Sequence, residues 1–130
     1  MKGYLINIER ETLENEDFRR VLYTAKHSQL VLMALKPGEE IGEEVHHLDQ
    51  FIRFEAGEGK VVLDGVEHAV KADDAVVIPE GTRHNVVNTG QGSMKLYTLY
   101  APPEHKDGVV EHAKADVYEE EFDGRTSEGA

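Results

Sequence analysis

The sequence predicts an all-β fold, in which short strands form a single small barrel or sandwich. Two observations carry this prediction. Apolar stretches rich in β-branched and aromatic residues recur along the chain at a spacing of about ten residues. Clusters of glycine, proline and aspartate separate them at positions typical of turns.

Seven stretches carry the strand pattern, at residues 21–24, 29–35, 51–54, 60–63, 67–70, 75–78 and 96–100. Asp64-Gly65 separates two of them and predicts a hairpin, because glycine tolerates the positive φ of a primed turn. Weak helical patterns at residues 9–17 and 111–118 predict short helical segments on the outside of the barrel.

A chain of 130 residues fits one domain that buries a core without covalent staples. We expect this domain to span residues 1–118, and residues 119–130 to form an acidic, flexible tail. The chain has no cysteine, which excludes disulfides, thiolate metal sites and a cysteine nucleophile.

The charge balance is strongly acidic, with 14 Lys and Arg against 26 Asp and Glu and a formal net charge of −12. Such a chain repels phosphate backbones, so we expect no nucleic-acid partner. No apolar run is long enough to span a membrane, and the first residues lack the apolar core of a signal peptide. We therefore expect a cytoplasmic protein that does not bind membranes.

Polar residues capable of binding a metal occur at residues 44–50 and again at His84, about 38 positions after His46. Glu44 and His46 lie two residues apart, and on extended backbone they point to the same side, away from Val45 and His47. Gln50 follows shortly after them, beyond an expected turn.

Residues 38–57 resemble the first cupin motif, in which two histidines one residue apart precede a glutamate and a glycine. The corresponding positions here are Gly38, Glu44, His46, Gln50 and Gly57.

Residues 79–88 are similar to the second cupin motif, with Pro79, Gly81, His84 and Asn88 at the expected spacing. The glycine that leads this motif in the family is Asp73 here. Both motifs occur in order, with a hairpin-rich stretch between them. The resemblance extends over most of the chain and implies a double-stranded β-helix, also called a jelly-roll or cupin barrel.

The resemblance also implies a divalent metal ion held by Glu44, His46, Gln50 and His84. His46 and His84 match the family's ligands, whereas Glu44 replaces a histidine and Gln50 replaces the glutamate. The carboxylate has in effect changed position, so the ligand charge stays at −1. Nitrogen and oxygen ligands of this kind suit Mn, Fe, Ni, Co or Zn. Some small manganese cupins that act as lyases are similar in carrying glutamine at the later position.

The remaining histidines are expected to play no part in the site. His47 is expected to point outward, and the others are expected to be ordinary surface residues: His27, His68, His105 and His112. Pro79, Gly81 and Asn88 are expected to be structural.

Two functions agree with these patterns. One is a metal-dependent enzyme that acts on a small organic molecule as an isomerase, lyase or dioxygenase, since the fold does not choose among these reactions. The other is a non-catalytic module that binds or senses a sugar or another small ligand. We also expect a homodimer, because small barrels have strand edges that need covering, and residues 4–8 are candidates to add a strand to the partner.

Overall fold

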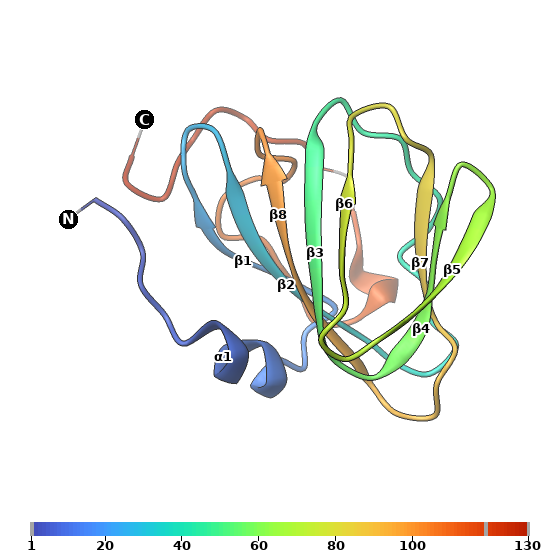
Figure 1. The fold of residues 1–130 in the computed structure, drawn as a ribbon. Helices are drawn as coiled ribbons and strands as arrows, with labels where there is room; N and C mark the ends of the chain where they lie inside the picture. Colours follow the sequence, from blue (N-terminus) through green and yellow to red (C-terminus); the bar gives the residue numbers. More distant parts are fainter. Residues whose placement is uncertain (1, 119, 130) are drawn as a thin grey trace.

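The computed structural model describes residues 2–118 and 120–129 and confirms the all-β fold. The strands form two antiparallel sheets that face each other (Figure 1). The larger sheet has the order β6-β3-β8-β2-β1-β9, and the smaller sheet has the order β5-β4-β7. This arrangement is the expected double-stranded β-helix.

All seven predicted strands are present among the described residues. The bounds are β1 Arg19–Thr24, β2 Gln29–Leu35, β3 Asp49–Ala56, β4 Glu58–Leu63, β5 Val66–Lys71, β6 Ala75–Ile78, β7 His84–Asn88, β8 Met94–Ala101 and β9 Val110–Glu111. The prediction missed β7 and β9. The first is a polar segment with two adjacent valines at its centre, and the second has only two residues.

The helical segments are shorter than predicted. The first, α1 (Ile8–Glu14), begins after Asn7, whose side chain accepts a hydrogen bond from the Arg10 N–H. In the second region only a 3-10 turn, η1 (Lys114–Asp116), forms, because Glu111 belongs to β9. None of the helices within the described residues has the length and apolar character needed to cross a membrane.

The core lies between the two sheets, and side chains from alternate strand positions fill it. Fully buried members from the larger sheet include Leu35, Ile52 and Phe54, and the smaller sheet contributes Val61 and Val86. Buried polar side chains, His46, Gln50 and His84, take the place of apolar ones in one part of the barrel.

Glycine is required where β4 meets β7. A Cβ atom on Gly59 would lie 2.1 Å from the carbonyl oxygen of Val87 and 2.4 Å from Cε of Met94. No side chain fits there without moving the backbone of β7. Gly59 therefore sets how closely the strand that carries His84 packs in the smaller sheet.

Two turns bear on the sequence patterns. Asp64 and Gly65 both have positive φ, at 48° and 83°, which confirms the hairpin between β4 and β5. Asp73 has a φ of 77°, in the left-handed region that favours glycine. This explains why glycine suits that position in the second cupin motif, and an aspartate tolerates it better than most other residues.

The described C-terminal residues lie against the barrel. The Phe122 N–H donates to the carbonyl of Glu104 at 2.9 Å, and Ser127 exchanges two hydrogen bonds with the backbone of Thr24, at 2.8 and 2.9 Å. The proposed domain boundary at residue 118 stays a prediction.

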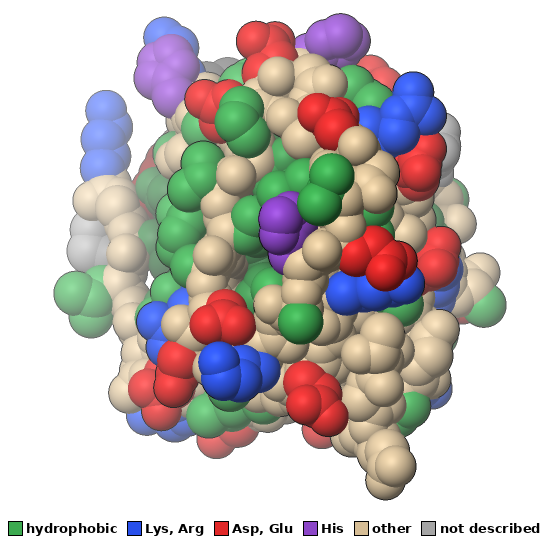
Figure 2. Space-filling view, turned by 45° about the vertical axis from the view of Figure 1, so that its right-hand side comes forward, with side chains coloured by type: hydrophobic (Ala, Val, Ile, Leu, Met, Phe, Trp, Pro, Cys, Tyr) green, Lys and Arg blue, Asp and Glu red, His purple; other side chains and the backbone are tan. Residues whose placement is uncertain are grey.

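The net negative charge is not gathered into one patch on the face drawn in Figure 2. Acidic and basic side chains are interspersed there, around hydrophobic side chains and one central histidine.

Candidate metal centre

Backbone pairing brings the two motifs together. Glu44 and His46 lie on the segment between β2 and β3, and His84 is the first residue of β7. Glu44 and His84 form an isolated antiparallel bridge, in which each N–H donates to the other residue's carbonyl at 2.9 Å. The side chains therefore meet because the chain holds their backbones side by side.

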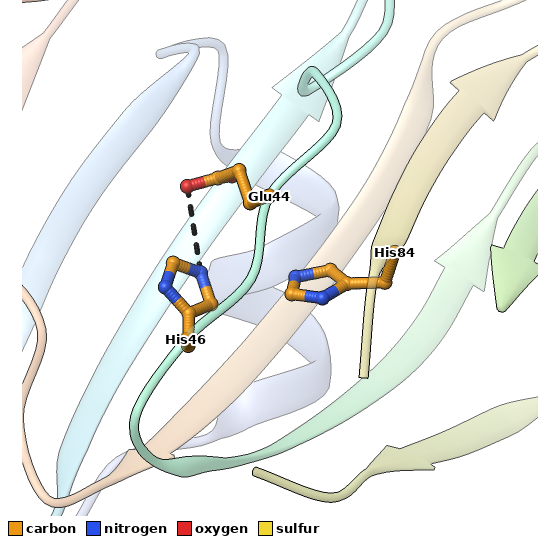
Figure 3. Close-up of side chains that lie close together, drawn as sticks. All are labelled: Glu44, His46 and His84. Carbon is orange, nitrogen blue, oxygen red and sulfur yellow. Dashed lines mark ion pairs between the residues drawn. The ribbon is translucent and has the colours of Figure 1, made fainter. Parts of the chain in front are cut away.

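The three side chains converge on one point (Figure 3). Donor atoms of Glu44, His46 and His84 all lie within 4.8 Å of one another. Nε2 of His46 is 3.4 Å from Oε2 of Glu44, and the two imidazole rings have centroids 5.0 Å apart. As expected, the neighbouring Val45 and His47 are exposed, whereas His46 is buried.

Hydrogen bonds orient both imidazoles. Nδ1 of His84 lies 2.9 Å from the carbonyl oxygen of Thr82, and Nδ1 of His46 lies 3.2 Å from Oε2 of Glu104. Carbonyl and carboxylate oxygens accept hydrogen bonds, so each Nδ1 carries a proton. In the neutral ring each Nε2 then keeps the lone pair that a metal needs, which is the usual arrangement around metal-bound histidines.

The contact between His46 and Glu104 changes the pKa values of both groups. Burial lowers the pKa of His46, but the hydrogen bond to Glu104 and the charge of Glu44 outweigh burial and raise it above 6.5. Burial raises the pKa of Glu104, but the hydrogen bond and charge of His46 outweigh it and lower the pKa below 4.5. Glu104 is therefore a carboxylate at neutral pH.

Gln50 lies on β3 and is 4% exposed. Its Nε2 donates to Oγ1 of Thr98 at 3.0 Å. This bond uses the amide nitrogen and leaves the side-chain carbonyl oxygen free to accept. That oxygen, Oε1, is buried and has no hydrogen-bond partner among the described residues. A buried carbonyl oxygen without a donor is costly, and a cation would satisfy it.

The residues fit a divalent ion. Donor atoms on opposite sides of such an ion lie about 4.2 Å apart, twice a bond of about 2.1 Å. The limit of 4.8 Å among the donor atoms of Glu44, His46 and His84 therefore requires only a small contraction. Two imidazole nitrogens with carboxylate and amide oxygens suit a first-row transition ion.

Glu44 and His46 line a pocket of about 440 Å³. Arg19, Glu104 and His105 line it too, as do residues 117, 118, 120 and 121. The pocket therefore has a polar lining of both charges, with room for a small organic molecule.

Tyr100 lies on β8 and is 3% exposed. Its ring is edge-on to His46, with centroids 6.0 Å apart, and edge-on to His105, with centroids 5.2 Å apart. Burial raises the pKa of Tyr100, so its phenol stays protonated.

The prediction that His105 is an ordinary surface residue is wrong. Its side chain lines the pocket, and burial followed by the charge of Arg19 lowers its pKa to about 3. The sequence analysis also missed Arg19 and Glu104. Arg19 could have been noticed, because it shares the buried side of β1 with Val21, where a charged residue is unusual. Nothing in the sequence singles out Glu104.

Asn88 has the structural role expected of it. Its Nδ2 donates to the carbonyls of Leu35 and Gly92, each at 2.9 Å, and its Oδ1 accepts from the N–H of Gly90. These bonds fix the loop that leaves β7 and tie it to β2.

Comparisons with known proteins agree with this architecture. The family model described as "Cupin domain" matches residues 31–100. YrkC of Bacillus subtilis is 46% identical over an alignment of 123 residues, which covers 89% of this chain and 66% of that protein. The chain thus spans just under two thirds of the length of this relative.

Solved structures give the same result. A crystal structure of a Bacillus halodurans protein has a TM-score of 0.86 and 46% identity, covering 88% of this chain and 92% of that one. An RmlC-like cupin from Shewanella frigidimarina has a TM-score of 0.59 and 25% identity, covering 65% and 74%.

Proposed function

This chain belongs to the cupin family, and we propose that it is a metal-dependent enzyme that acts on a small organic molecule. The observation that carries the proposal is the convergence of Glu44, His46 and His84, with donor atoms within 4.8 Å of one another at the edge of a pocket. Perturbed and unpartnered polar groups concentrated in one pocket are typical of functional sites.

Glu44, His46, Gln50 and His84 would hold a divalent ion, with Mn, Fe, Co, Ni and Zn as candidates. When bound, the ion would supply Lewis acidity to a substrate oxygen. Glu104 would keep His46 in the tautomer that offers Nε2, because its carboxylate accepts the proton on Nδ1. The unpartnered Oε1 of Gln50 supports its place in the set.

Tyr100 would supply a proton donor next to His46. Its raised pKa keeps the phenol protonated, and its ring lies next to both His46 and His105. A neutral phenol beside a cation can donate a hydrogen bond to a developing oxyanion. This favours isomerase or lyase chemistry, in which protons move between carbon and oxygen.

The metal content of the purified protein tests the proposal. We expect stoichiometric metal in the wild type after loading with Mn²⁺, Fe²⁺, Co²⁺, Ni²⁺ or Zn²⁺, and its loss in His84→Ala, measured by mass spectrometry of the elements. His68→Ala is the matched control, because His68 is exposed on β5 and lies outside the donor group.

Two results would overturn the metal proposal: a wild type that accepts none of these ions, or a folded His84→Ala variant that retains stoichiometric metal. A metal-free wild type that still binds small sugars would favour the non-catalytic module instead.

We further propose that the chain forms a homodimer. Leu5 is 98% exposed in the segment before α1, and Val77 is 64% exposed on β6, an edge strand of the larger sheet. Exposed apolar residues and an open strand edge both favour pairing with another copy. Light scattering should give the dimer mass for the wild type and a lower mass for Leu5→Glu; a monomeric wild type would contradict the dimer.

A further inference from the structure

Arg19 places a buried guanidinium beside the proposed metal centre. It is the first residue of β1, is 7% exposed and lines the same pocket as Glu44 and His46. Its Nη1 donates to Oε1 of Glu111 at 2.7 Å, across the pairing of β1 with β9.

This ion pair uses only one of the hydrogen-bond donors of the guanidinium. A guanidinium has five N–H groups, and the bond to Glu111 is the one that its side chain makes among the described residues. Nε of Arg19 is buried without a partner. Glu111 is satisfied on both oxygens, because Oε2 accepts the N–H of Tyr118 at 3.1 Å. The donors that remain on Arg19 therefore call for a second anion.

His105 adds a second unpartnered group to the same wall. Its Nε2 is buried and has no partner among the described residues. Burial and the charge of Arg19 keep the pKa of His105 at about 3, so at neutral pH the ring is uncharged and one nitrogen carries a proton. The Tyr100 ring lies edge-on to both His46 and His105, and both histidines line the same pocket as Arg19.

Five glutamates line the pocket. Glu44 belongs to the metal donor group, Glu121 makes no ion pair among the described residues, and the other three are paired. Glu43 pairs with Arg83 at 2.8 Å, Glu120 pairs with Lys106 at 3.1 Å, and Glu104 pairs with His46. Arg19 is the one Arg or Lys among the described residues that line the pocket. Arg19 is therefore the one fixed cationic side chain that an incoming anion would meet among these lining residues, besides a bound metal ion.

We propose that Arg19, with His105, binds a carboxylate of the substrate, so that the enzyme acts on a small organic acid whose other end reaches the metal. The planar guanidinium matches a carboxylate with two parallel hydrogen bonds. This inference rests on the proposed function for the metal end of the pocket, whereas the Arg19 end stands on its own contacts.

The alternative is that Arg19 serves only the ion pair with Glu111. Replacing Arg19 and Glu111 together distinguishes the two roles. Ligand binding should weaken if Arg19 binds the substrate, and should not change if Arg19 serves only the ion pair. Arg19→Gln alone leaves Glu111 buried without its partner and endangers folding. The double variant Arg19→Gln/Glu111→Gln removes both charges together, so it takes away the guanidinium without leaving a buried charge unpaired.

The test uses full-length protein loaded with Mn²⁺, with metal content measured first. Isothermal titration with malonate, succinate and glutarate is compared with titration by acetate, butyrate and pentanoate. We expect at least one dicarboxylate to bind about tenfold more tightly than the monocarboxylates, since one charge-assisted pair contributes about that much. We expect the double variant to lose this preference, and Arg83→Gln, which removes a cation outside the pocket, to retain it.

Equal affinities for the two series, or a preference that survives in the folded double variant, would overturn the inference while leaving the metal site intact. If the protein takes up no metal, the proposed function fails and the Arg19 subsite is tested on the metal-free protein. There, glutarate binding that disappears in the double variant supports the subsite, and no binding by the wild type overturns it.

Discussion

Glu104 holds His46 from the side opposite to Glu44: Oε2 of Glu104 lies 3.2 Å from Nδ1, while Oε2 of Glu44 lies 3.4 Å from Nε2. One imidazole thus links the supporting carboxylate of Glu104 to the carboxylate that we propose as a metal ligand, Glu44. This relationship determines which nitrogen is available to an ion, and it can be tested directly.

Replacing Glu104 with glutamine should weaken metal binding by about 10–100-fold, the usual effect of removing a group that orients a metal-binding histidine. Competition with a fluorescent chelator measures the affinity. Glu43→Gln is the matched control, because Glu43 lines the pocket but pairs with the exposed Arg83. Equal losses in both variants would show that general charge, and not the contact with His46, is responsible.

Replacing Gln50 with glutamate should affect the metal-free and metal-loaded protein in opposite directions. Without metal, a carboxylate at this buried position lacks a donor for one oxygen, and unfolding should become easier by about 1–3 kcal/mol. With metal, the added charge should tighten binding. Urea unfolding with and without Mn²⁺ measures both effects, with the exposed Gln91→Glu as control. A Gln50→Glu variant that binds metal no better than the wild type would argue against ligation at this position.

The stability of the metal-free protein should depend on pH through His46 and Glu104. The raised pKa of His46 stabilises the fold below 6.5, and this contribution is lost as pH rises through the folded pKa. The lowered pKa of Glu104 stabilises the fold above 4.5, and this contribution is lost as pH falls through the folded pKa. Thermal melts of wild type and Glu104→Gln should therefore differ most between pH 4.5 and 6.5. A difference that does not vary with pH would contradict this assignment.

His105 should remain uncharged far below the range in which histidine normally titrates. Its pKa of about 3 means that the ring-proton NMR signal of His105 should not move between neutral pH and pH 5. A titration midpoint for His105 near 6.5 would show that its ring is open to water, and would weaken the case for the Arg19 subsite.

Gly59→Ala should destabilise the protein by about 1–3 kcal/mol, because the added methyl group meets the backbone of Val87. Gly92→Ala is the control, since a Cβ there has no atom within 4 Å, and its effect should stay within about 0.5 kcal/mol. Equal denaturation midpoints for the two variants would mean that β4 and β7 can separate at low cost.

Much of the barrel could be predicted from the sequence because its strands carry their own signal. The run at residues 29–35 is apolar after Gln29, and it matches β2 at both ends. By contrast, β7 consists of polar residues around two valines, and its extended form comes from pairing with β4. Long-range pairing of this kind leaves no local pattern.

The site residues, like the strands, could be predicted where the local sequence carries a pattern and not where it does not. His46 and His84 could be found because motif spacing fixes them, and the structure brings them together with Glu44. Arg19 and Glu104 could not be found by spacing, because they reach the pocket from β1 and from the segment after β8, far from either motif. The four-ligand set with Gln50 stays a prediction.

The bridge between Glu44 and His84 has a consequence for how the ion comes and goes. Zinc fingers fold only when metal arrives, so chelators unfold them. Here backbone hydrogen bonds hold two of the donor residues in place beforehand, and the ordering entropy of those residues has been spent in folding the chain. A chelator should therefore remove the ion without unfolding the protein, and the metal-free protein should bind metal again. One ion should exchange for another while the barrel stays folded.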